Sequence, residues 1–320
     1  MGTLVEIIAL VKELPESYLE ETLSKLKEIK ERADEEGESS NVECPHCQSA
    51  KVVRNGRKHK KQYYLCRDCK KCFAPTTKSP ICGSHSSPTV WKQVISDTVN
   101  GVSIDKTADN LDLHHETVFN MRHKILYCVE QSLIANPTVL TGACEADETY
   151  VLESEKGRKF PENYHRNPRK HGAKASKAGI SNEYVCVCAS VTGSGENVAV
   201  AVNRASPDGK EILEVFGNRV NESTVVLCDG KQSYNALDDK CTVAITKRIN
   251  KVNGFHSFIK EKLNAMRGAA TIYLNRYAAL FSKIYAADKS VVDDIYQLIV
   301  SQSGAVNNVA HIQTNNLLNV

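Results

Sequence analysis

The spacing of apolar and polar positions divides the chain into a helical first part and a second part that mixes strands with helices. Near the N-terminus, Leu19, Leu23, Leu26 and Ile29 recur at spacings of three and four, which predicts an amphipathic helix over residues 16–33. Such a helix either packs on its own neighbour or mediates self-association, and the pattern fits both equally well.

Residues 90–133 show helical periodicity in three runs. The second and third runs, Ser103–Leu111 and His114–Leu126, have the lengths of a helix-turn-helix motif with its turn at Asp112. An ordinary helical hairpin would give the same pattern, but the basic segment that precedes the motif favours DNA binding. On that interpretation the second helix presents five polar side chains outward: His115, Asn120, Arg122, His123 and Lys124.

After Pro137 the pattern changes to short apolar runs that are typical of strands. Five strands are predicted, at residues 143–152, 184–192, 197–202, 224–228 and 242–246. A helical pattern at 211–220 separates the third strand from the fourth, and helices dominate from Asn253 onward. Strands interleaved with helices predict an α/β domain. The segment 155–181, rich in Lys, Arg, Gly and Pro, is predicted to be a functional or mobile insertion between the first two strands.

The composition of the 320 residues, 41% hydrophobic and 25% charged, is typical of a globular protein with two or three domains. It excludes wholesale disorder, collagen-like repeats and coiled-coil fibres. No apolar run approaches the roughly 20 residues that span a bilayer. The N-terminal apolar stretch contains Glu6 and follows no basic residue, so we expect no secretory signal. These features predict a cytoplasmic protein without a membrane partner.

The net charge of +3 conceals a segregation of charge along the chain. Residues 1–41 hold eleven acidic residues against five basic ones, whereas residues 43–92 hold eleven basic residues against two acidic ones. A solvated basic face would also account for the second count. A basic module beside an acidic one nevertheless favours a polyanionic partner such as nucleic acid.

Four of the twelve cysteines form two C-x2-C pairs, Cys44 with Cys47 and Cys66 with Cys69, separated by 18 residues. Two such pairs complete the tetrahedral thiolate shell that structural Zn(II) prefers, so the spacing predicts a zinc ribbon. The closed shell leaves no position for catalysis. Its basic residues are predicted to contact DNA phosphates: Arg54, Arg57, Lys58, Lys60, Lys61 and Arg67.

Two acidic residues occupy positions where a carboxylate is costly unless it is paired or binds metal. Asp147 lies within a predicted strand, where alternation points Glu145, Asp147 and Thr149 to one face. Asp229 follows the apolar strand 224–228 directly. Taken alone, each acid is more often structural than functional.

A third group lies on a predicted helix over residues 253–266. Asn253, His256 and Lys260 fall at i, i+3 and i+7 and therefore share one helix face. A carboxamide able to bind metal would then lie about two turns from a lysine able to bind phosphate.

With these residues the chain resembles a family of bacterial insertion-sequence transposases, of the ISXO type. They join an N-terminal zinc ribbon to a DDE-type, RNase H-like catalytic domain in which Asn and Lys follow two Asp residues. The resemblance covers Cys44 to Tyr285. Its motifs are the four cysteines, Glu-Ala-Asp-Glu-Thr-Tyr at 145–150, Cys-Asp-Gly at 228–230 with Tyr234, Asn-x2-His-Ser-x2-Lys at 253–260, and Arg-Gly-x4-Tyr-Leu-x2-Tyr at 267–277. The chain departs from the family at Ile272 and Leu280, where Lys and Trp are expected, which puts target contacts or packing in doubt.

The resemblance implies Asp147, Asp229 and Asn253 as ligands of two catalytic Mg(II) or Mn(II) ions, and Lys260 as a DNA-binding helper. The implied activity is cleavage of the ends of the chain's own insertion sequence and transfer of the freed 3′-hydroxyls to target DNA. Because Asn253 is neutral where the usual residue is Glu, we hypothesise that Glu145 or Glu148 supplies the missing charge, with Glu145 favoured.

The expected organisation has five segments: an acidic amphipathic helix at 1–41, the zinc ribbon at 42–80, a helix-turn-helix at 88–135, the RNase H-like domain at 140–285 with its insertion at 155–181, and a helical tail at 286–320. The insertion is predicted to become ordered when the protein binds DNA. The alternative, that it is a dispensable surface loop, fits the sequence nearly as well. Its basic residues expected to bind DNA include Arg166, Arg169 and Lys170.

The expected partners are the double-stranded terminal inverted repeats of the element and its target DNA, bound by a homo-oligomer associated with the nucleoid. Two alternatives stay open. One is a non-catalytic zinc-ribbon DNA-binding regulator derived from a transposase, and the other is a cellular RNase H-like nuclease that cleaves without joining ends.

Overall fold

The structure is a computed structural model that describes Tyr18, Lys25 and residues 42–58, 61–160, 162, 164–169, 173–287 and 291–302. The chain forms two compact units, residues 1–77 and residues 78–320, which are described separately below. Apart from Tyr18 and Lys25, the helix predicted at 16–33 lies outside the described residues, as does the part of the predicted C-terminal tail beyond Gln302.

The first unit contains a three-stranded antiparallel sheet in the order β1-β2-β3. Its strands are β1 (Val52–Lys58), β2 (Lys61–Cys66) and β3 (Cys72–Phe73). The buried core contains two rings, Tyr64 and Phe73, stacked with centroids 5.7 Å apart, together with Cys44 and Cys66. A core this small cannot stabilise a sheet alone, so the unit depends on an additional cross-link such as a metal.

The second unit begins with three helices, α3 (Pro88–Val99), α4 (Ile104–Leu111) and α5 (His115–Ala135). Each has a polar N-cap: the side chains of Ser87, Ser103 and His114 accept hydrogen bonds from backbone N–H groups in the first turn. The turn between α4 and α5 is possible because Asp112 adopts a left-handed conformation with φ of 50°. α4 matches the predicted Ser103–Leu111 closely, and α5 begins as predicted but continues nine residues beyond the predicted end at Leu126.

A five-stranded mixed sheet forms the centre of the second unit, in the order β6-β5-β4-β7-β8. The strands are β4 (Ala143–Leu152), β5 (Tyr184–Thr192), β6 (Asn197–Arg204), β7 (Val225–Cys228) and β8 (Thr242–Ile245). β5 runs antiparallel to β4 and β6, whereas β7 runs parallel to β4 and β8 parallel to β7. All five predicted strands are confirmed, and so is the α/β class.

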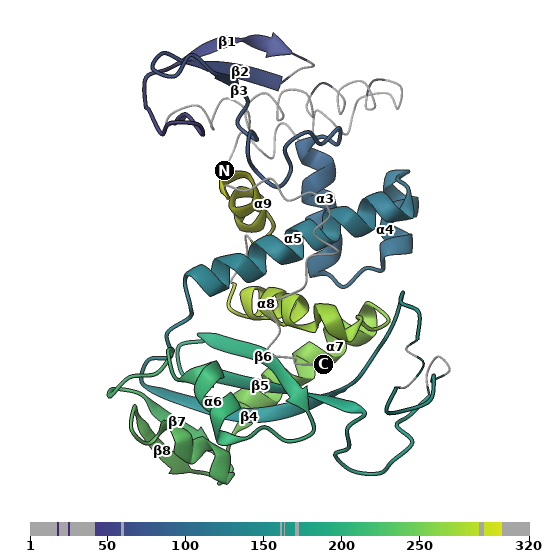
Figure 1. Ribbon diagram of the computed structural model, residues 1–320, viewed down its shortest axis with the longest axis vertical. Coiled ribbons are helices and arrows are strands. Elements are labelled where there is room, and N and C mark those ends of the chain that lie inside the picture. Colours follow the sequence, from purple (N-terminus) through teal and green to yellow (C-terminus); the bar gives the residue numbers. More distant parts are fainter. Residues whose placement is uncertain are drawn as a thin grey trace. The chain divides into compact units, whose positions relative to one another are not determined.

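Helices cover both faces of this sheet (Figure 1). α6 (Gly209–Phe216) and η1 (Gln232–Leu237) lie on one face, and α7 (Asn250–Ala265) and α8 (Leu274–Tyr285) lie on the other. η2 (Thr271–Tyr273) directly precedes α8, and α9 (Val291–Ser301) packs against α3 and α5 instead of the sheet. Side chains alternate between the faces: on β5, Val187 and Ala189 point toward α7 and α8, while Cys186 and Cys188 point toward α6 and η1. β4 is therefore the central strand of a sheet that is covered on both sides.

The segment after β4 is fixed by a buried ion-pair network around Glu153, whose side chain is fully buried. Glu153 Oε1 accepts a hydrogen bond from Arg204 Nε at 2.7 Å, and Oε2 accepts one from Arg166 Nε at 3.1 Å. His165 Nε2 lies 3.0 Å from the same carboxylate. A second pair joins Arg169 Nη1 to Glu183 Oε2 at 2.9 Å.

These contacts change the interpretation of the insertion 155–181. Its described residues are already ordered by bonds within the chain, so the prediction that it becomes ordered on DNA is not supported for them. Arg166 and Arg169, predicted to bind DNA, have guanidinium groups engaged by buried carboxylates, and we assign them to holding the insertion instead. Lys170 lies outside the described residues.

The Glu153 network predicts a large stability loss on neutralisation. Glu153→Gln leaves buried cations without their counter-charge and should lower the free energy of unfolding by about 3 kcal/mol. Urea unfolding followed by fluorescence of the single tryptophan, Trp91, which is buried in this unit, measures the change. Glu222→Gln, at an exposed acid, is the control and should change stability by less than about 0.5 kcal/mol. Equal effects of the two substitutions would show that the network contributes little.

Candidate functional site

The four ribbon cysteines meet at one point of the first unit. Their Sγ atoms all lie within 4.8 Å of one another, with Cys44 and Cys69 at 3.6 Å and Cys47 and Cys66 at 3.5 Å. Sulfur ligands at 2.3 Å from a tetrahedral zinc are about 3.8 Å apart, so the four residues fit a structural Zn(II). The Cys69 N–H donates to Cys66 Sγ, and such bonds lower the pKa of the Cys66 thiol to about 6, which favours the thiolate that a metal binds.

Several of the ribbon's predicted DNA contacts are exposed on this unit: Arg54, Arg57, Lys58 and Arg67. Lys60 lies outside the described residues, and the side chain of Lys61 is not among those described. One acid, Asp68, lies among the basic residues, where it accepts a hydrogen bond from Ser49 and pairs with Lys51 at 3.5 Å.

The helix-turn-helix prediction needs a correction on α5. His115 and Asn120 are exposed as predicted, but Arg122 and His123 are each only 1% exposed. Arg122 Nη2 donates to the Val102 carbonyl at 2.8 Å, and the His123 ring lies against the ring of Tyr273. The outward placement of both residues was wrong because α5 is covered on more than one side, and Arg122 is withdrawn as a DNA contact. Lys124 is half-buried, and burial lowers its pKa.

In the second unit, Asp147 and Asp229 lie on neighbouring parallel strands. β4 and β7 pair Ala143 with Val225 and Glu145 with Leu227. Continuing this register by two residues brings Asp147 beside Asp229, which directly follows β7. The two predicted acids therefore meet, 82 positions apart in sequence, because the sheet aligns their strands.

The surroundings of Asp147 disfavour its charge. Its pKa is raised to about 6, first by burial and then by the negative charges of Glu148 and Asp229. A backbone hydrogen bond from Glu148 and the positive charge of Lys231 act in the opposite direction. Among the described residues, no Lys or Arg forms an ion pair with Asp147. Neighbouring carboxylates without an ion-paired cation are typical of a divalent-cation site.

α7 contacts this carboxylate through a residue to which the sequence assigned no role. His256 Nδ1 lies 3.9 Å from Asp147 Oδ2, and the His256 side chain is 8% exposed. Burial lowers the pKa of His256 to about 4, so the imidazole is neutral at pH 7. Asn253 and Lys260, both exposed, lie one turn before and one turn after it on the same face. The spacing of His256 was visible in the sequence, but not its contact with Asp147.

The two acids predicted to supply extra charge both have partners. Glu148 accepts a hydrogen bond from Lys231 Nζ at 2.9 Å, so its charge is already offset. Glu145 Oε2 accepts hydrogen bonds from the backbone N–H groups of Lys251 at 2.6 Å and Val252 at 3.1 Å, in the first turn of α7.

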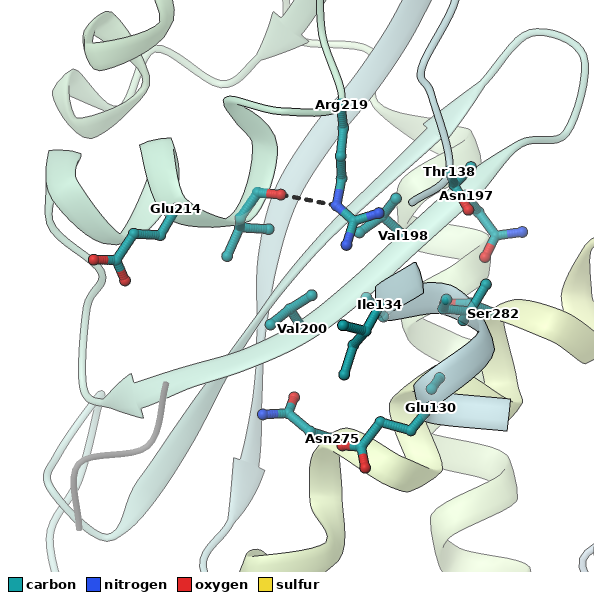
Figure 2. A pocket seen from close by; sticks show the side chains of 14 residues that line it. Glu130, Ile134, Thr138, Asn197, Val198, Val200, Glu214, Arg219, Asn275 and Ser282 are labelled. Carbon is teal, nitrogen blue, oxygen red and sulfur yellow. Dashed lines mark hydrogen bonds between the residues drawn. The ribbon is translucent and has the colours of Figure 1, made fainter. Parts of the chain in front are cut away.

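A separate pocket of about 160 Å³ lies along β6, the edge strand of the sheet. Figure 2 shows Arg219 beside it, with its Nε donating to the Val215 carbonyl at 3.0 Å. Asn275 also lines the pocket, and its side-chain amide binds the free edge of β6. The Ala201 N–H donates to Asn275 Oδ1 at 2.7 Å, and Asn275 Nδ2 donates to the Ala201 carbonyl at 3.1 Å. None of the four predicted catalytic residues lines this pocket, so it is distinct from the acidic site.

The N-terminal part of the chain, which contains the ribbon, is similar to known proteins of insertion elements. Residues 38–70 match the InsA N-terminal domain family. The insertion element iso-IS1N protein InsA of Shigella dysenteriae is 32% identical over 81 residues, which cover 25% of this chain and 86% of that protein. In this N-terminal part the chain belongs to the InsA family.

A second relative matches beyond the InsA-type ribbon. An uncharacterised protein in transposable element ISH50 of Halobacterium salinarum is 28% identical over 204 residues, which cover 62% of this chain and 66% of that protein's length. The chain is thus related to proteins of transposable elements. Within the described residues, no helix is long and apolar enough to cross a membrane.

Among solved structures, the crystal structure of a pre-cleavage Mos1 transpososome is similar at 9% identity and a TM-score of 0.23, covering 64% of this chain and 75% of that one. A score this low carries no argument about function. The mixed sheet itself resembles an RNase H-like fold. β4, β5 and β6 form an antiparallel meander, β7 and β8 extend it on the β4 side, and β5 alone among the five strands runs opposite to the others.

The thiolate cluster predicts one bound zinc per chain. Cys66→Ser should reduce the zinc content from about one equivalent to nearly none and unfold the first unit, because its core is too small to fold unaided. Atomic absorption measures the metal, and Trp91 fluorescence reports the second unit, which should unfold as in the wild type. Cys82→Ser, at an exposed thiol outside the cluster, is the control. Full zinc retention in Cys66→Ser would rule out this ligand set.

The raised pKa of Asp147 predicts that neutralising it stabilises the metal-free site. The folded pKa of about 6 exceeds the usual 3.8, so the charge of Asp147 destabilises the folded state increasingly as pH rises from 3.8 to about 6, and by a constant amount above that. Asp147→Asn should therefore raise the free energy of unfolding at pH 8 by roughly 1–3 kcal/mol in buffer without Mg(II), and the gain should vanish near pH 4. Urea unfolding at both pH values measures it. A gain that does not depend on pH would contradict the assignment.

Proposed function

We propose that the chain is a DNA transposase that cleaves the ends of its own insertion sequence and joins the 3′-hydroxyls to target DNA by metal-dependent phosphoryl transfer. The observation that carries the proposal is the alignment of Asp147 with Asp229 on neighbouring strands, without an ion-paired Lys or Arg at Asp147 in the described residues. A half-buried carboxylate whose ionisation is disfavoured by burial and by neighbouring acids is costly for a purely structural protein, and a bound divalent cation would relieve that cost.

Three side chains fit the metal that this chemistry needs. Asp147, Asp229 and Asn253 offer oxygen ligands, which suit Mg(II) or Mn(II). When bound, two such ions stabilise the attacking and leaving oxygens of an in-line displacement. The neutral imidazole of His256 beside Asp147 takes up no proton at pH 7 and so adds no positive charge that would compete with a cation.

Basic residues in each of the two units are suited to hold DNA. Lys260 is exposed one turn beyond His256, where its ammonium can bind a phosphate of the strand being cut. In the InsA-type ribbon, Arg54, Arg57, Lys58 and Arg67 supply further phosphate contacts, and α4 and α5 supply a helix-turn-helix. We assign these parts to the terminal inverted repeats of the element, bound by a homo-oligomer.

The relatives support a mobile-element role in general terms. One is named as a protein of transposable element ISH50, and the other as InsA of the insertion element iso-IS1N. Neither name states a reaction, so the catalytic assignment depends on the acidic site of this chain. A non-catalytic zinc-ribbon regulator would share the ribbon but would have no use for that site.

A cleavage and strand-transfer assay tests the proposal. The DNA that flanks the gene should contain inverted repeats, and a duplex carrying one repeat should be nicked at its end and joined to target DNA with Mg(II) present. Asp229→Ala should reduce both reactions by on the order of a thousandfold, because it removes a proposed ligand of the metal that stabilises the transition state, while leaving affinity for the repeat within about twofold.

Asp239→Ala is the control, since it removes an exposed acid close in sequence to Asp229. It should leave both reactions unchanged. Tight repeat binding without any nicking by the wild type would favour the regulator, and nicking without joining would favour a cellular nuclease.

A further inference from the structure

The first turn of α7 is capped from a different part of the chain. Its N-cap residue, Ile249, has no side-chain oxygen and makes no capping hydrogen bond. Glu145 supplies the acceptor instead, since its Oε2 binds the N–H groups of Lys251 and Val252 at 2.6 and 3.1 Å. These are the second and third residues of the helix, whose N–H groups a local N-cap side chain normally binds. A carboxylate here also interacts favourably with the helix dipole.

Glu145 and Asp147 make successive contacts with the same helix. Two residues of a strand advance about 6.8 Å, and four residues of a helix advance about 6 Å. Glu145 contacts Val252. Asp147 lies two residues after Glu145 on the strand, and it contacts His256, which lies four residues after Val252 on the helix. β4 and α7 therefore run side by side in the same direction, and the Glu145 bonds set their register.

The far end of α7 is also held to the segment after β4. Lys156 Nζ donates to the carbonyls of Arg267 and Gly268 at 3.2 and 3.3 Å, just beyond the end of the helix. Ser154 and Thr271 exchange two hydrogen bonds, each of 2.8 Å. In the first turn, next to Asn253, the hydrogen bonds to other described elements are those of Glu145 with two backbone N–H groups and that of the Lys251 side chain with the Gly193 carbonyl.

We infer that Glu145 is a positioning residue of the acidic site: by binding the first turn of α7, it fixes the helix face that carries Asn253, His256 and Lys260 against Asp147. This inference rests on the proposed function and differs from the sequence-based hypothesis that Glu145 supplies a missing negative charge. A positioning role requires an acceptor oxygen, whereas charge compensation requires a carboxylate.

Two substitutions at Glu145 separate these roles. Glu145→Ala removes the acceptor, so hydrogen exchange of the amides in residues 250–256 should accelerate by at least about tenfold. Strand transfer should fall on the order of a hundredfold, because small displacements of catalytic groups cost that much. Glu145→Gln keeps an acceptor oxygen without the charge, and it should restore slow exchange and bring transfer to within about threefold of the wild type.

Other results would overturn the inference. If Glu145→Gln keeps slow exchange but is as inactive as Glu145→Ala, the charge matters and the positioning role is wrong. If Glu145→Ala leaves exchange unchanged, the bonds do not hold the helix. Hydrogen exchange needs no DNA, so it decides the role of Glu145 even if the wild type proves to have no strand-transfer activity.

A second pair of variants guards against misfolding of Glu145→Ala. Lys251→Pro removes the N–H that donates at 2.6 Å but keeps Glu145, and proline is tolerated in the first turn of a helix. Lys251→Ala removes only the side chain, which donates to the Gly193 carbonyl at 3.2 Å. Transfer should be at least about fivefold slower in Lys251→Pro than in Lys251→Ala. Equal rates would contradict the proposed role of the N–H bond.

Asp208→Ala is the matched control for the loss of a helix cap. Asp208 caps α6 by accepting from Glu211 N–H at 2.9 Å, and α6 carries none of the proposed site residues. This variant should lower the melting temperature as Glu145→Ala does, but it should transfer strands at the wild-type rate. A comparable loss of transfer in Asp208→Ala would mean that any destabilisation inactivates the protein.

Discussion

The second unit is organised by the need to accommodate four carboxylates on or next to its central strand. β4 and the residue that follows it carry Glu145, Asp147, Glu148 and Glu153, and burying a charge without a partner is costly. Three of these acids have partners: Glu145 has backbone N–H groups of α7, Glu148 has Lys231, and Glu153 has Arg204 and Arg166. Among the described residues, Asp147 has no ion-paired Lys or Arg, and the charge of Lys231 only partly offsets the effect of burial and of the neighbouring acids on its pKa. The proposed metal site is therefore the place where the described part of β4 carries a half-buried acid without an ion-pair partner.

The partners of these acids also explain how the elements are held together. Glu145 joins β4 to the start of α7, and Glu153 joins the end of β4 to β6 through Arg204 and to the insertion through Arg166. Because charged hydrogen bonds are strongly directional, they fix orientation more sharply than apolar contacts do. The apolar packing of α7 and α8 on the sheet supplies the main driving force for their association. The hydrogen bonds of the carboxylates then fix the orientation of these elements relative to one another.

The strands and the cysteine cluster could be predicted from sequence because each depends on a local signal. Alternation located β4 and β5 to the residue, and C-x2-C spacing located the ribbon ligands. Arg122 and His123 were misplaced because a periodic pattern gives the apolar stripe of a helix but not the number of its buried sides. The contacts of Glu153 with Arg204 and of Glu145 with Lys251 join residues 51 and 106 positions apart, and no local pattern encodes them.

The Asn275 amide beside β6 has a consequence for how the sheet ends. An edge strand with free N–H and C=O groups is a template on which another chain can add a strand, which leads to domain swapping or aggregation. By occupying both groups of Ala201, the Asn275 side chain imitates one residue of a sixth strand. At this edge of the sheet a single amide thus blocks Ala201, and a foreign strand could pair with that residue only by displacing Asn275.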